Sequence, residues 1–259
     1  MSIITITSDW SRDDFYTAAI KGKILSRCPG TQIIEITNQV PPFAIALAAF
    51  QLKNSFMHFP DGSVHIVAVN NTQRENISHV ALKIKQHFFI GYNNGIFGLL
   101  TEDQPAEIVQ LNAGYKGCFA ELDVFADAAS ELVLNGELAK LGMPVSELNR
   151  QLPVLPAIDE SVINGSIIYI DSYRNAFTNI SVDVFERIGK GRSFEIFVQS
   201  NHNRISHLNT NYNESSPGEL LAMFNSVGLL EIAINGGNAA DLLNLGLNSS
   251  VRVKFRDAD

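Results

Sequence analysis

Ile3-Ile4-Thr5-Ile6-Thr7-Ser8-Asp9-Trp10 lies near the start of the chain, and Ser11-Arg12-Asp13-Asp14 follows it directly. The first stretch is alternating and β-branched and predicts a short strand, and the second resembles the S-x-x-D capping box of a helix. Ligands of open α/β sheets bind beyond the carboxyl ends of the strands, where Asp9 stands. Its carboxylate suits the two hydroxyls of a ribose, and capping the following helix is the alternative role.

Helix and strand patterns alternate beyond this stretch. Apolar residues from Phe15 to Leu25 keep helical spacing until Pro29-Gly30, and residues 32–37 predict a second strand. The two strands of such a strand–helix–strand unit run parallel. The N-terminal part of the chain therefore predicts an α/β domain with a largely parallel sheet.

The same alternation continues to residue 151. A stiff loop at Pro41-Pro42 precedes a buried helix at 44–57, and a third strand at 64–69 ends on Asn70-Asn71-Thr72, at the edge expected for Asp9. The other elements expected here are paired strands at 80–85 and 87–91, a tight turn at 92–95 leading into 96–100, a strand at 107–111 and a helix at 125–134 ending at Asn135-Gly136. We assign residues 1–151 to this domain.

The composition then changes. Residues 152–161, which contain Pro153 and Pro156 and the polar Asp159-Glu160-Ser161, predict a linker. Beyond it the periodicity is mainly two, with strands expected at 166–170, 177–182, 194–198, 229–234 and 251–255. Short strands at fairly regular spacing are typical of a small all-β barrel, so residues 162–259 predict a β-barrel-like C-terminal domain.

The overall composition excludes several classes of protein. The chain has 259 residues, 46% of them hydrophobic and 18% charged, with a net charge of −8 and no basic run of five or more residues. We therefore expect neither a nucleic-acid partner nor an anionic membrane surface. No window approaches 18 uncharged apolar residues and no signal-peptide pattern is present, so we expect a soluble, cytoplasmic protein.

Cysteine and histidine spacing does not predict a metal site. Cys28 and Cys118 form neither a CxxC nor a metal-type spacing. Among the six histidines, His202 and His207 are separated by an odd spacing that puts them on opposite faces of a strand. His65 alternates within an apolar strand and is expected to be a core histidine with its polar atoms bonded. We predict no metal.

Three polar stretches of the C-terminal half are candidates for ligand binding. They are 171–179, 225–231 and 235–240, and Tyr212 lies in the loop before the second. The first combines a carboxylate, an aromatic ring and two amides, and the bare backbone of the last could approach a flat heteroaromatic ring. Ordinary β-turns, where Asn and Gly belong in any case, are the alternative for each stretch.

Taken together, these stretches resemble the S-adenosyl-L-methionine (SAM) hydroxide adenosyltransferase family, relatives of the SAM-dependent fluorinases and chlorinases. The resemblance rests on Thr7-Ser8-Asp9-Trp10 with Asp14 and Tyr16, Glu35-Ile36-Thr37-Asn38-Gln39-Val40-Pro41-Pro42-Phe43, Phe59-Pro60-Asp61-Gly62-Ser63-Val64-His65, Asn93-Asn94-Gly95, the run 171–180 and the run 225–240. Several long matches in the right order extend nearly from end to end of the chain.

The resemblance implies a fold, a ligand and an assembly. It implies an N-terminal α/β domain, a C-terminal β-barrel-like domain, and a homotrimer that holds SAM or adenosine between the N-terminal domain of one subunit and the C-terminal domain of its neighbour. No separate cofactor is implied. The ligand-binding positions carried over are Asp9 on the ribose hydroxyls, Phe43 and Tyr212 as ribose- and adenine-lining rings, Asp171 and Ser226 at the methionine end, Asn175 and Gly236 at the adenine, and Asn70, Tyr173 and Asn235.

The chain departs from the family at the positions that promote hydrolysis. The family supplies an Asp and an Arg in a V-D-P-G-V-G-x-x-R-R stretch and a His in F-H-G-R-D. An ungapped match puts Asn70 at the Asp, Ile77 at the Arg and Ala120 at the His, while Arg74 could substitute only if the loop is rebuilt. An Asn cannot act as a base, and Ile and Ala cannot orient water.

Two functions stay open at this point, with a collapsed remnant of the family as a weaker third. The first is a SAM-binding enzyme that resembles SAM hydrolases, converting SAM and water to adenosine and methionine with other groups such as Arg74 or Glu121. The second is a non-catalytic trimer that senses or sequesters an adenosyl ligand. Loss of a cooperating catalytic group can remove most of the rate and leave the binding residues intact.

Overall fold

The computed structural model describes residues 2–11, 13–69, 78–101, 105, 107–112 and 119–256. The chain divides into two compact units, Met1–Pro153 and Val154–Asp259. Residues 157–158, inside the expected linker, form strand β8 (Ala157–Ile158), which pairs with β9 (Val162–Ile170). That part of the expected linker is therefore built into the second unit.

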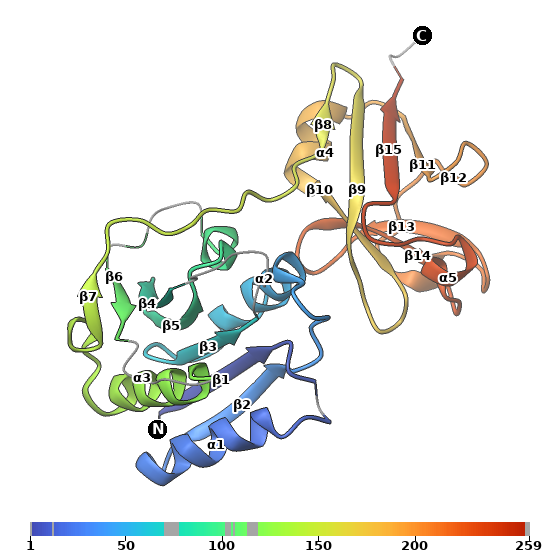
Figure 1. Ribbon diagram of the computed structural model, residues 1–259. Coiled ribbons are helices and arrows are strands. Elements are labelled where there is room, and N and C mark those ends of the chain that lie inside the picture. The colour runs from blue at the N-terminus through green and yellow to red at the C-terminus, as the bar shows by residue number, and fades with distance from the viewer. Residues whose placement is uncertain are drawn as a thin grey trace. The chain divides into compact units, whose positions relative to one another are not determined.

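A mixed sheet forms the centre of the first unit (Figure 1). Its strands in the described residues are β1 (Ile3–Ser8), β2 (Gln32–Thr37), β3 (Val64–Ala68), β4 (His79–Ile84), β5 (His87–Tyr92), β6 (Ile108–Leu111) and β7 (Gly142–Pro144), in the order β2-β1-β3-β5-β4-β6-β7. The strands from β2 to β5 in this order run parallel, and β4, β6 and β7 are antiparallel to their neighbours. The predicted α/β domain is confirmed.

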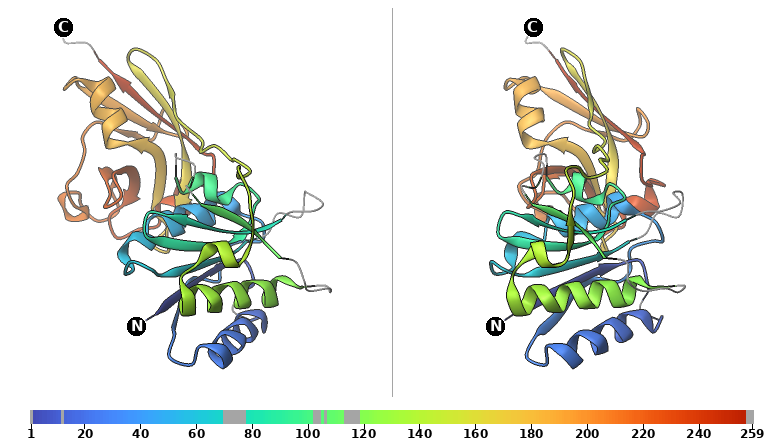
Figure 2. Two further views of the ribbon diagram at one scale, coloured as in Figure 1. Left: turned by 90° about the vertical axis from the view of Figure 1, so that its left-hand side faces the viewer. Right: turned by 60° about the vertical axis from the view of Figure 1, so that its left-hand side comes forward.

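Helices cover both faces of this sheet (Figure 2). The helices are α1 (Tyr16–Arg27), α2 (Ile45–Lys53), α3 (Glu121–Asn135) and the short 3-10 turns η1 (Phe56–His58), η2 (Ile96–Leu99) and η3 (Leu138–Lys140). Alternation along β3 divides the core, because Ile66 packs with α1 and α3 whereas Val67 packs with α2. The inner strands β1, β3 and β5 are thus largely buried, whereas the edge strand β2 is partly exposed, and the parallel strands end at one common edge.

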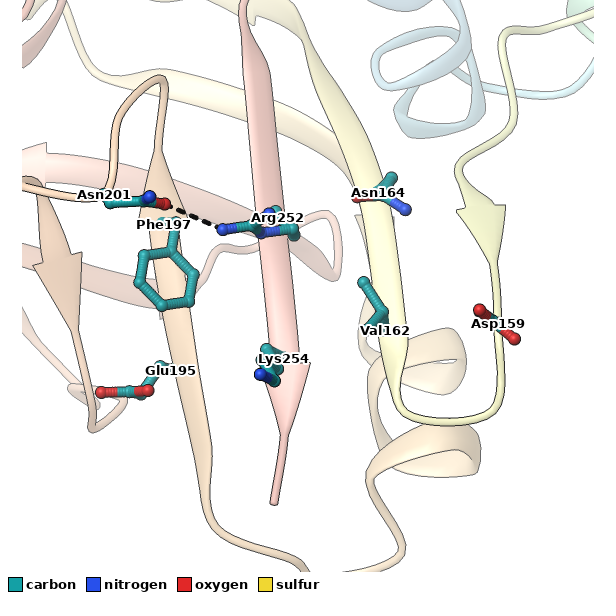
Figure 3. Close-up of a pocket in the computed structure, with 8 residues that line it drawn as sticks. All are labelled: Asp159, Val162, Asn164, Glu195, Phe197, Asn201, Arg252 and Lys254. Carbon is teal, nitrogen blue, oxygen red and sulfur yellow. Dashed lines mark hydrogen bonds between the residues drawn. The ribbon is translucent and has the colours of Figure 1, made fainter.

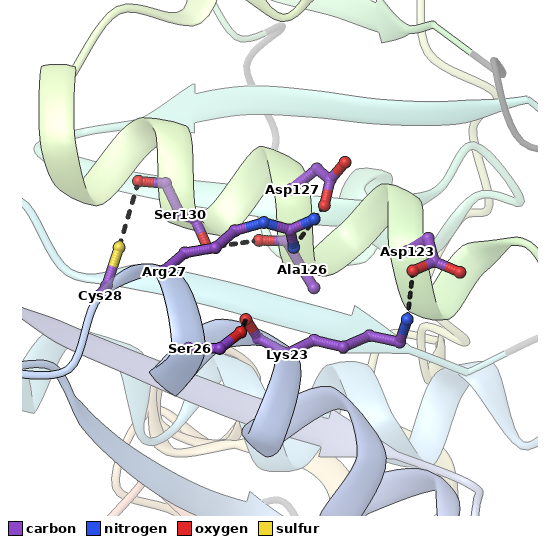
Figure 4. A network of polar contacts seen from close by, with 8 residues as sticks. All are labelled: Lys23, Ser26, Arg27, Cys28, Asp123, Ala126, Asp127 and Ser130. Atoms are coloured by element: carbon purple, nitrogen blue, oxygen red, sulfur yellow. Dashed lines mark hydrogen bonds and ion pairs between the residues drawn. The ribbon is translucent and has the colours of Figure 1, made fainter.

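Polar contacts join α1 to α3 beside their apolar interface (Figure 4). Lys23 pairs with Asp123, and Arg27 Nη1 lies 2.5 Å from Asp127 Oδ1. The buried thiol of Cys28 donates to the Ser130 carbonyl at 3.7 Å. Half-exposed ion pairs contribute little, so burial of apolar residues holds these helices together.

The structure differs from the sequence-based expectation at three elements of the first unit, and the cause is local in each case. Helix α1 begins after Phe15 with no side-chain cap, so the predicted capping box is wrong; Ser11 Oγ instead accepts the Asp13 amide at 3.4 Å. Helix α2 ends at Lys53, four residues before the predicted end at residue 57. Just beyond this end, Ser55 Oγ donates to the carbonyl of Gln51. Residues 96–99 form η2, since Gly95 has a φ of 103° and starts a tight 3-10 turn.

The second unit is an antiparallel sheet that is nearly barrel-shaped. Its strands are β8 and β9 with β10 (Ala176–Ser181), β11 (Phe194–Val198), β12 (Arg204–Ile205), β13 (Leu220–Phe224), β14 (Leu229–Ile234) and β15 (Ser250–Phe255), in the order β12-β11-β15-β9-β10-β14-β13 with β8 beside β9. One apolar cluster fills its interior. The predicted β-barrel-like domain is confirmed.

The sequence-based prediction for this unit contained strands alone, but the structure also contains helices. They are α4 (Val182–Gly189), α5 (Ala239–Leu242) and the 3-10 turn η4 (Tyr212–Glu214). Val182, expected in a strand, begins α4 because Ser181 Oγ accepts the Val184 amide at 3.3 Å as a helix cap, and Phe185 turns into the core. Among the described residues, no helix has the length and apolar character needed to span a membrane.

Candidate functional site

Asp9 follows β1 at the common carboxyl edge of the parallel strands. Its Oδ2 accepts a hydrogen bond of 3.0 Å from the backbone amide of Phe43, and its own amide donates to the Ala68 carbonyl at 3.3 Å. The alternative role of Asp9 as a helix cap is wrong, since α1 begins at Tyr16 without a side-chain cap. The structure therefore brings together Asp9 and Phe43, two of the three predicted ligand residues of the first unit, and the third, Asn70, lies outside the described residues.

Phe43 is held in an unusual backbone conformation. Its φ is 67°, in the left-handed region that side chains with a Cβ avoid at a cost of roughly 1 kcal/mol or more. The preceding Pro41-Pro42 pair restricts the approach to this residue, and the Ala44 amide donates to the Pro41 carbonyl at 3.0 Å. The bond to Asp9 offsets part of this strain, while the Phe43 side chain remains 50% exposed.

Tyr92 and Glu121 form a second polar pair in this unit, of which only Glu121 was named from the sequence. Tyr92, at the end of β5, donates its hydroxyl to Glu121 Oε1 at 3.0 Å, and the His79 ring lies 5.3 Å from the Tyr92 ring. Burial raises the pKa of Tyr92 well above its usual range, and the carboxylates of Glu121 and Asp9 raise it further. Tyr92 therefore stays a donor at neutral pH, within electrostatic reach of Asp9.

Strand register explains why these groups converge. Ser8 of β1 pairs with Ala68 of β3, and Val67 of β3 pairs with Gly91 of β5. Asp9 and Tyr92 therefore lie at the same edge of the sheet, at the ends of two strands that are separated by β3. Two strand spacings amount to about 10 Å. Tyr92 was not predicted as a site residue, although a tyrosine at the carboxyl end of an apolar strand was an available signal.

Of the three positions at which the family resemblance implies a substituted catalytic residue, Ala120 alone lies in the described part of the chain. Ala120 precedes α3 as its N-cap residue, and no side-chain hydrogen bond caps the helix there. Asn70, Ile77 and the possible substitute Arg74 lie outside the described residues. Glu121, next to Ala120, is the first residue of α3 and is the carboxylate bonded to Tyr92.

In the second unit, Asp171 and Asn175 close a tight turn between β9 and β10. Asp171 Oδ1 accepts the Asn175 amide at 2.8 Å and its Oδ2 accepts the Asn175 side-chain amide at 3.3 Å. Arg174 in the same turn has a φ of 67° and binds Asp241 of α5. Tyr173, at the tip, is 77% exposed. The predicted Asp171 carboxylate and Asn175 amide are thus hydrogen-bonded to each other, and the exposed Tyr173 lies between them in the sequence.

Tyr212 is bonded to a carboxylate that was not predicted as a site residue. Its hydroxyl donates to Glu231 Oε1 at 2.7 Å, and Glu231 is only 1% exposed. Burial raises the pKa of the Glu231 carboxyl, the bond from Tyr212 lowers it, and the Asp171 carboxylate raises it. An acidic residue inside the apolar strand 229–234 was the available signal.

The remaining predicted residues lie at the two ends of β14. Asn235 and the exposed Gly236, with a φ of 67°, follow the strand, and the Asn235 side-chain amide donates to the Ser215 carbonyl at 2.7 Å. Ala176 pairs with Ile232, so the turn containing Asp171 and Asn175 belongs to this end of β14. Ser226 precedes the strand, in an exposed turn at the other end. The structure therefore does not group Ser226 with the other predicted residues.

A surface cavity of ≈ 500 Å³ lies elsewhere in the second unit (Figure 3). Arg252 donates to Asn201 Oδ1 at 2.9 Å and lies over the Phe197 ring at 4.9 Å, and Glu195 accepts from two arginines. No predicted site residue lines this cavity. Glu195 pairs with Arg204 and Arg256 beside the cavity, and such ion pairs are ordinary on the solvated face of a sheet.

Metal ligands do not converge anywhere in the described ranges: no group of three or more His, Cys, Asp or Glu side chains there could hold an ion. The buried histidines bond to other protein groups instead. His65 Nδ1 lies 2.7 Å from Thr5 Oγ1, and its Nε2 lies 3.1 Å from His87 Nδ1. The prediction that His65 is a core histidine is confirmed.

The fold defines a two-domain class in which a mixed α/β sheet is followed by a nearly closed antiparallel barrel. The SAM hydroxide adenosyltransferase N-terminal domain matches residues 4–142 and the C-terminal domain of the same name matches residues 165–252. The chain belongs to the SAM hydroxide adenosyltransferase family. The resemblance inferred from the sequence is therefore confirmed.

Individual relatives agree with this assignment. The chain is 26% identical to an (R)-S-adenosyl-L-methionine hydrolase of Salinispora arenicola, over 96% of this chain and 97% of that one. It is 23% identical to a fluorinase of an Actinoplanes species, over 73% and 75%. An uncharacterized conserved protein of Thermotoga maritima has the same fold, with a TM-score of 0.86 over 98% of this chain and all of that one, at 23% identity.

Proposed function

We propose that this protein binds an adenosyl ligand, SAM or adenosine, and that its Asp9 carboxylate binds the ribose hydroxyls. The observation that carries the proposal is the placement of Asp9 by the Phe43 amide at the carboxyl edge of the sheet, in a chain of this family. A carboxylate oriented by a backbone donor is prepared to accept further hydrogen bonds without reorganising. Asp171, Asn175 and Tyr212 supply polar and aromatic groups suited to the rest of such a ligand.

Hydrolysis of SAM is the catalytic form of this proposal. In that reaction a water oxygen attacks C5′, the C5′–sulfur bond breaks with its electron pair moving to sulfur, and methionine leaves while the water releases a proton. Glu121, bonded to Tyr92 and set at the first turn of α3, is a carboxylate that can accept this proton. The named hydrolase relatives make the (R) epimer of SAM the substrate to test first.

A non-catalytic binding protein is the second candidate, and the methyl group of Ala120 favours it. A site that has lost the histidine of the family retains its binding residues but loses a group that holds water. Such a protein would sense or sequester the nucleoside. For either candidate we propose the homotrimer of the family, with the ligand held between domains of neighbouring subunits and no further cofactor, nucleic acid or membrane partner.

The deciding experiment combines calorimetry with a product assay. Purified protein is titrated with adenosine, (R)-SAM and (S)-SAM, and the same samples are analysed for adenosine and methionine by chromatography. Binding with turnover above that in buffer supports the hydrolase, and binding without turnover supports the second candidate. Absence of both heat and thermal shift with all three ligands would refute the proposal. Light scattering on the same samples tests the trimer.

A further inference from the structure

Glu231 is a buried carboxylate on the outer face of the barrel. Its strand neighbours Leu230 and Ile232 belong to the interior apolar cluster, so alternation along β14 directs Glu231 to the opposite face. A buried carboxylate is costly unless it accepts hydrogen bonds. The Tyr212 hydroxyl supplies one, at 2.7 Å, from a loop that crosses this face.

The loop that carries Tyr212 is itself firmly attached to the sheet. The Asn209 amide donates to the Ala222 carbonyl at 2.8 Å, and the Asn209 side chain donates to Ser215 Oγ at 2.9 Å. On the other side of Tyr212, the Asn235 side chain donates to the Ser215 carbonyl. Tyr212 is therefore anchored through its backbone on both sides and through its hydroxyl at the far end of the ring.

This attachment leaves the ring of Tyr212 available. Tyr212 as a whole residue is 41% exposed although its hydroxyl is bonded to a buried group, so its ring contributes to the exposed surface. Burial, with the Glu231 and Asp171 carboxylates, raises the pKa of Tyr212, and Asp171 in turn binds Asn175. A fixed aromatic face beside a carboxylate and an amide suits a flat heteroaromatic base that bears hydrogen-bonding groups.

We propose that Glu231 is a positioning residue, which holds the Tyr212 ring as the stacking surface for the adenine of the ligand. This inference rests on the proposed function, since it assigns the adenine end of the same site. A ring fixed before binding loses less rotational freedom when the base stacks on it, and this preorganisation strengthens binding. Glu231, being buried, acts through Tyr212 and does not contact the ligand.

The test uses variants that separate the ring from its anchor. Tyr212→Phe keeps the ring and removes the bond, and Glu231→Leu keeps the volume and removes the acceptor; we expect each to raise the adenosine Kd about 5- to 30-fold. Glu231→Gln retains an acceptor oxygen and is expected to stay within about threefold of the parent. The double variant Tyr212→Phe/Glu231→Leu should bind no worse than either single variant, because both remove the same bond.

Controls distinguish this role from a structural one. Glu186, exposed on α4, receives the same changes to Gln and Leu, which are expected to leave the adenosine Kd unchanged. Melting temperatures of all variants are recorded, and Tyr212→Phe and Glu231→Gln keep the test valid if Glu231→Leu fails to fold. A parent protein that binds neither adenosine nor SAM refutes the proposed function. A parent that binds, with unchanged affinity in Tyr212→Phe, refutes the positioning role alone.

Discussion

The backbone amide of Phe43 donates a 3.0 Å hydrogen bond to Oδ2 of Asp9, joining the end of β1 to the loop before α2. The bond orients the carboxylate and holds Phe43 at a φ of 67°. One acidic side chain therefore has two tasks, supporting a strained loop and presenting an acceptor at the carboxyl edge of the sheet. Substitutions at Asp9 separate these tasks.

Asp9→Ala should weaken adenosine binding by roughly 100-fold, because hydrogen bonds from two hydroxyls to a charged group are lost. It should also destabilise the fold by about 1 kcal/mol through the lost Phe43 bond. Calorimetry and urea unfolding measure the two effects, with Asp13→Ala, an exposed neighbour, as the control. An affinity equal to that of the parent would mean that the ribose is bound elsewhere.

Glu121→Gln tests the catalytic form of the proposal. The amide oxygen can still accept the Tyr92 hydroxyl, but it cannot take a proton from water. We expect SAM turnover to fall by about 100-fold or more with the adenosine Kd unchanged. Asp123→Asn, in the same turn of α3 and paired with Lys23, is the matched control. Equal turnover in Glu121→Gln and the parent would exclude Glu121 as the base.

Introducing the Asp, Arg and His that the family resemblance implies tests whether these groups alone limit SAM turnover. The triple variant Asn70→Asp/Ile77→Arg/Ala120→His should raise SAM turnover at least tenfold over the parent, since such groups act as a unit and single restorations accomplish little. Adenosine and methionine release is measured by chromatography, with Ala120→His alone as the control. A triple variant that binds SAM and is no faster than the parent would show that further residues have diverged.

Because His65 is buried, we expect the folded protein to lose stability in acid. Burial, with a smaller contribution from His87, lowers the pKa of His65 from 6.5 to about 3. Since the folded pKa lies below the unfolded one, the unfolded chain binds the proton first, and stability present above pH 6.5 is lost as the pH falls toward 3. The expected slope is up to about 1.4 kcal/mol per pH unit, diminished by relaxation of the site.

Urea unfolding at pH 7, 6 and 5 measures this slope. His65→Asn, which cannot titrate, should be less stable at pH 7 because the bonds to Thr5 and His87 change, but it should lose less stability on acidification. His58→Asn, at an exposed histidine, should behave like the parent. Identical slopes in the parent and His65→Asn would show that His65 does not control the acid response.

Much of the fold could be predicted from the chain because its signals are local. The alternation of Ile3 to Thr7, the stop at Pro29-Gly30 and the strand at 194–198 each depend on neighbouring residues, and each was placed within a residue or two. Helix α4 was missed for an equally physical reason. Its first residue, Val182, continues the alternation of the β-branched Thr178 and Ile180, and only the Ser181 cap and the burial of Phe185 favour a helix there.

By itself the sequence determined the two-domain architecture, the family, and the residue types available to hold an adenosyl ligand. Only the tertiary structure decided which of them meet. Asp9 binds the Phe43 amide, Tyr92 binds Glu121 and Tyr212 binds Glu231, all between residues distant along the chain. All three pairs depend on how distant strands and loops are brought together, and burial adds to the cost of leaving the groups of the last two unpaired; neither leaves a local pattern in the sequence.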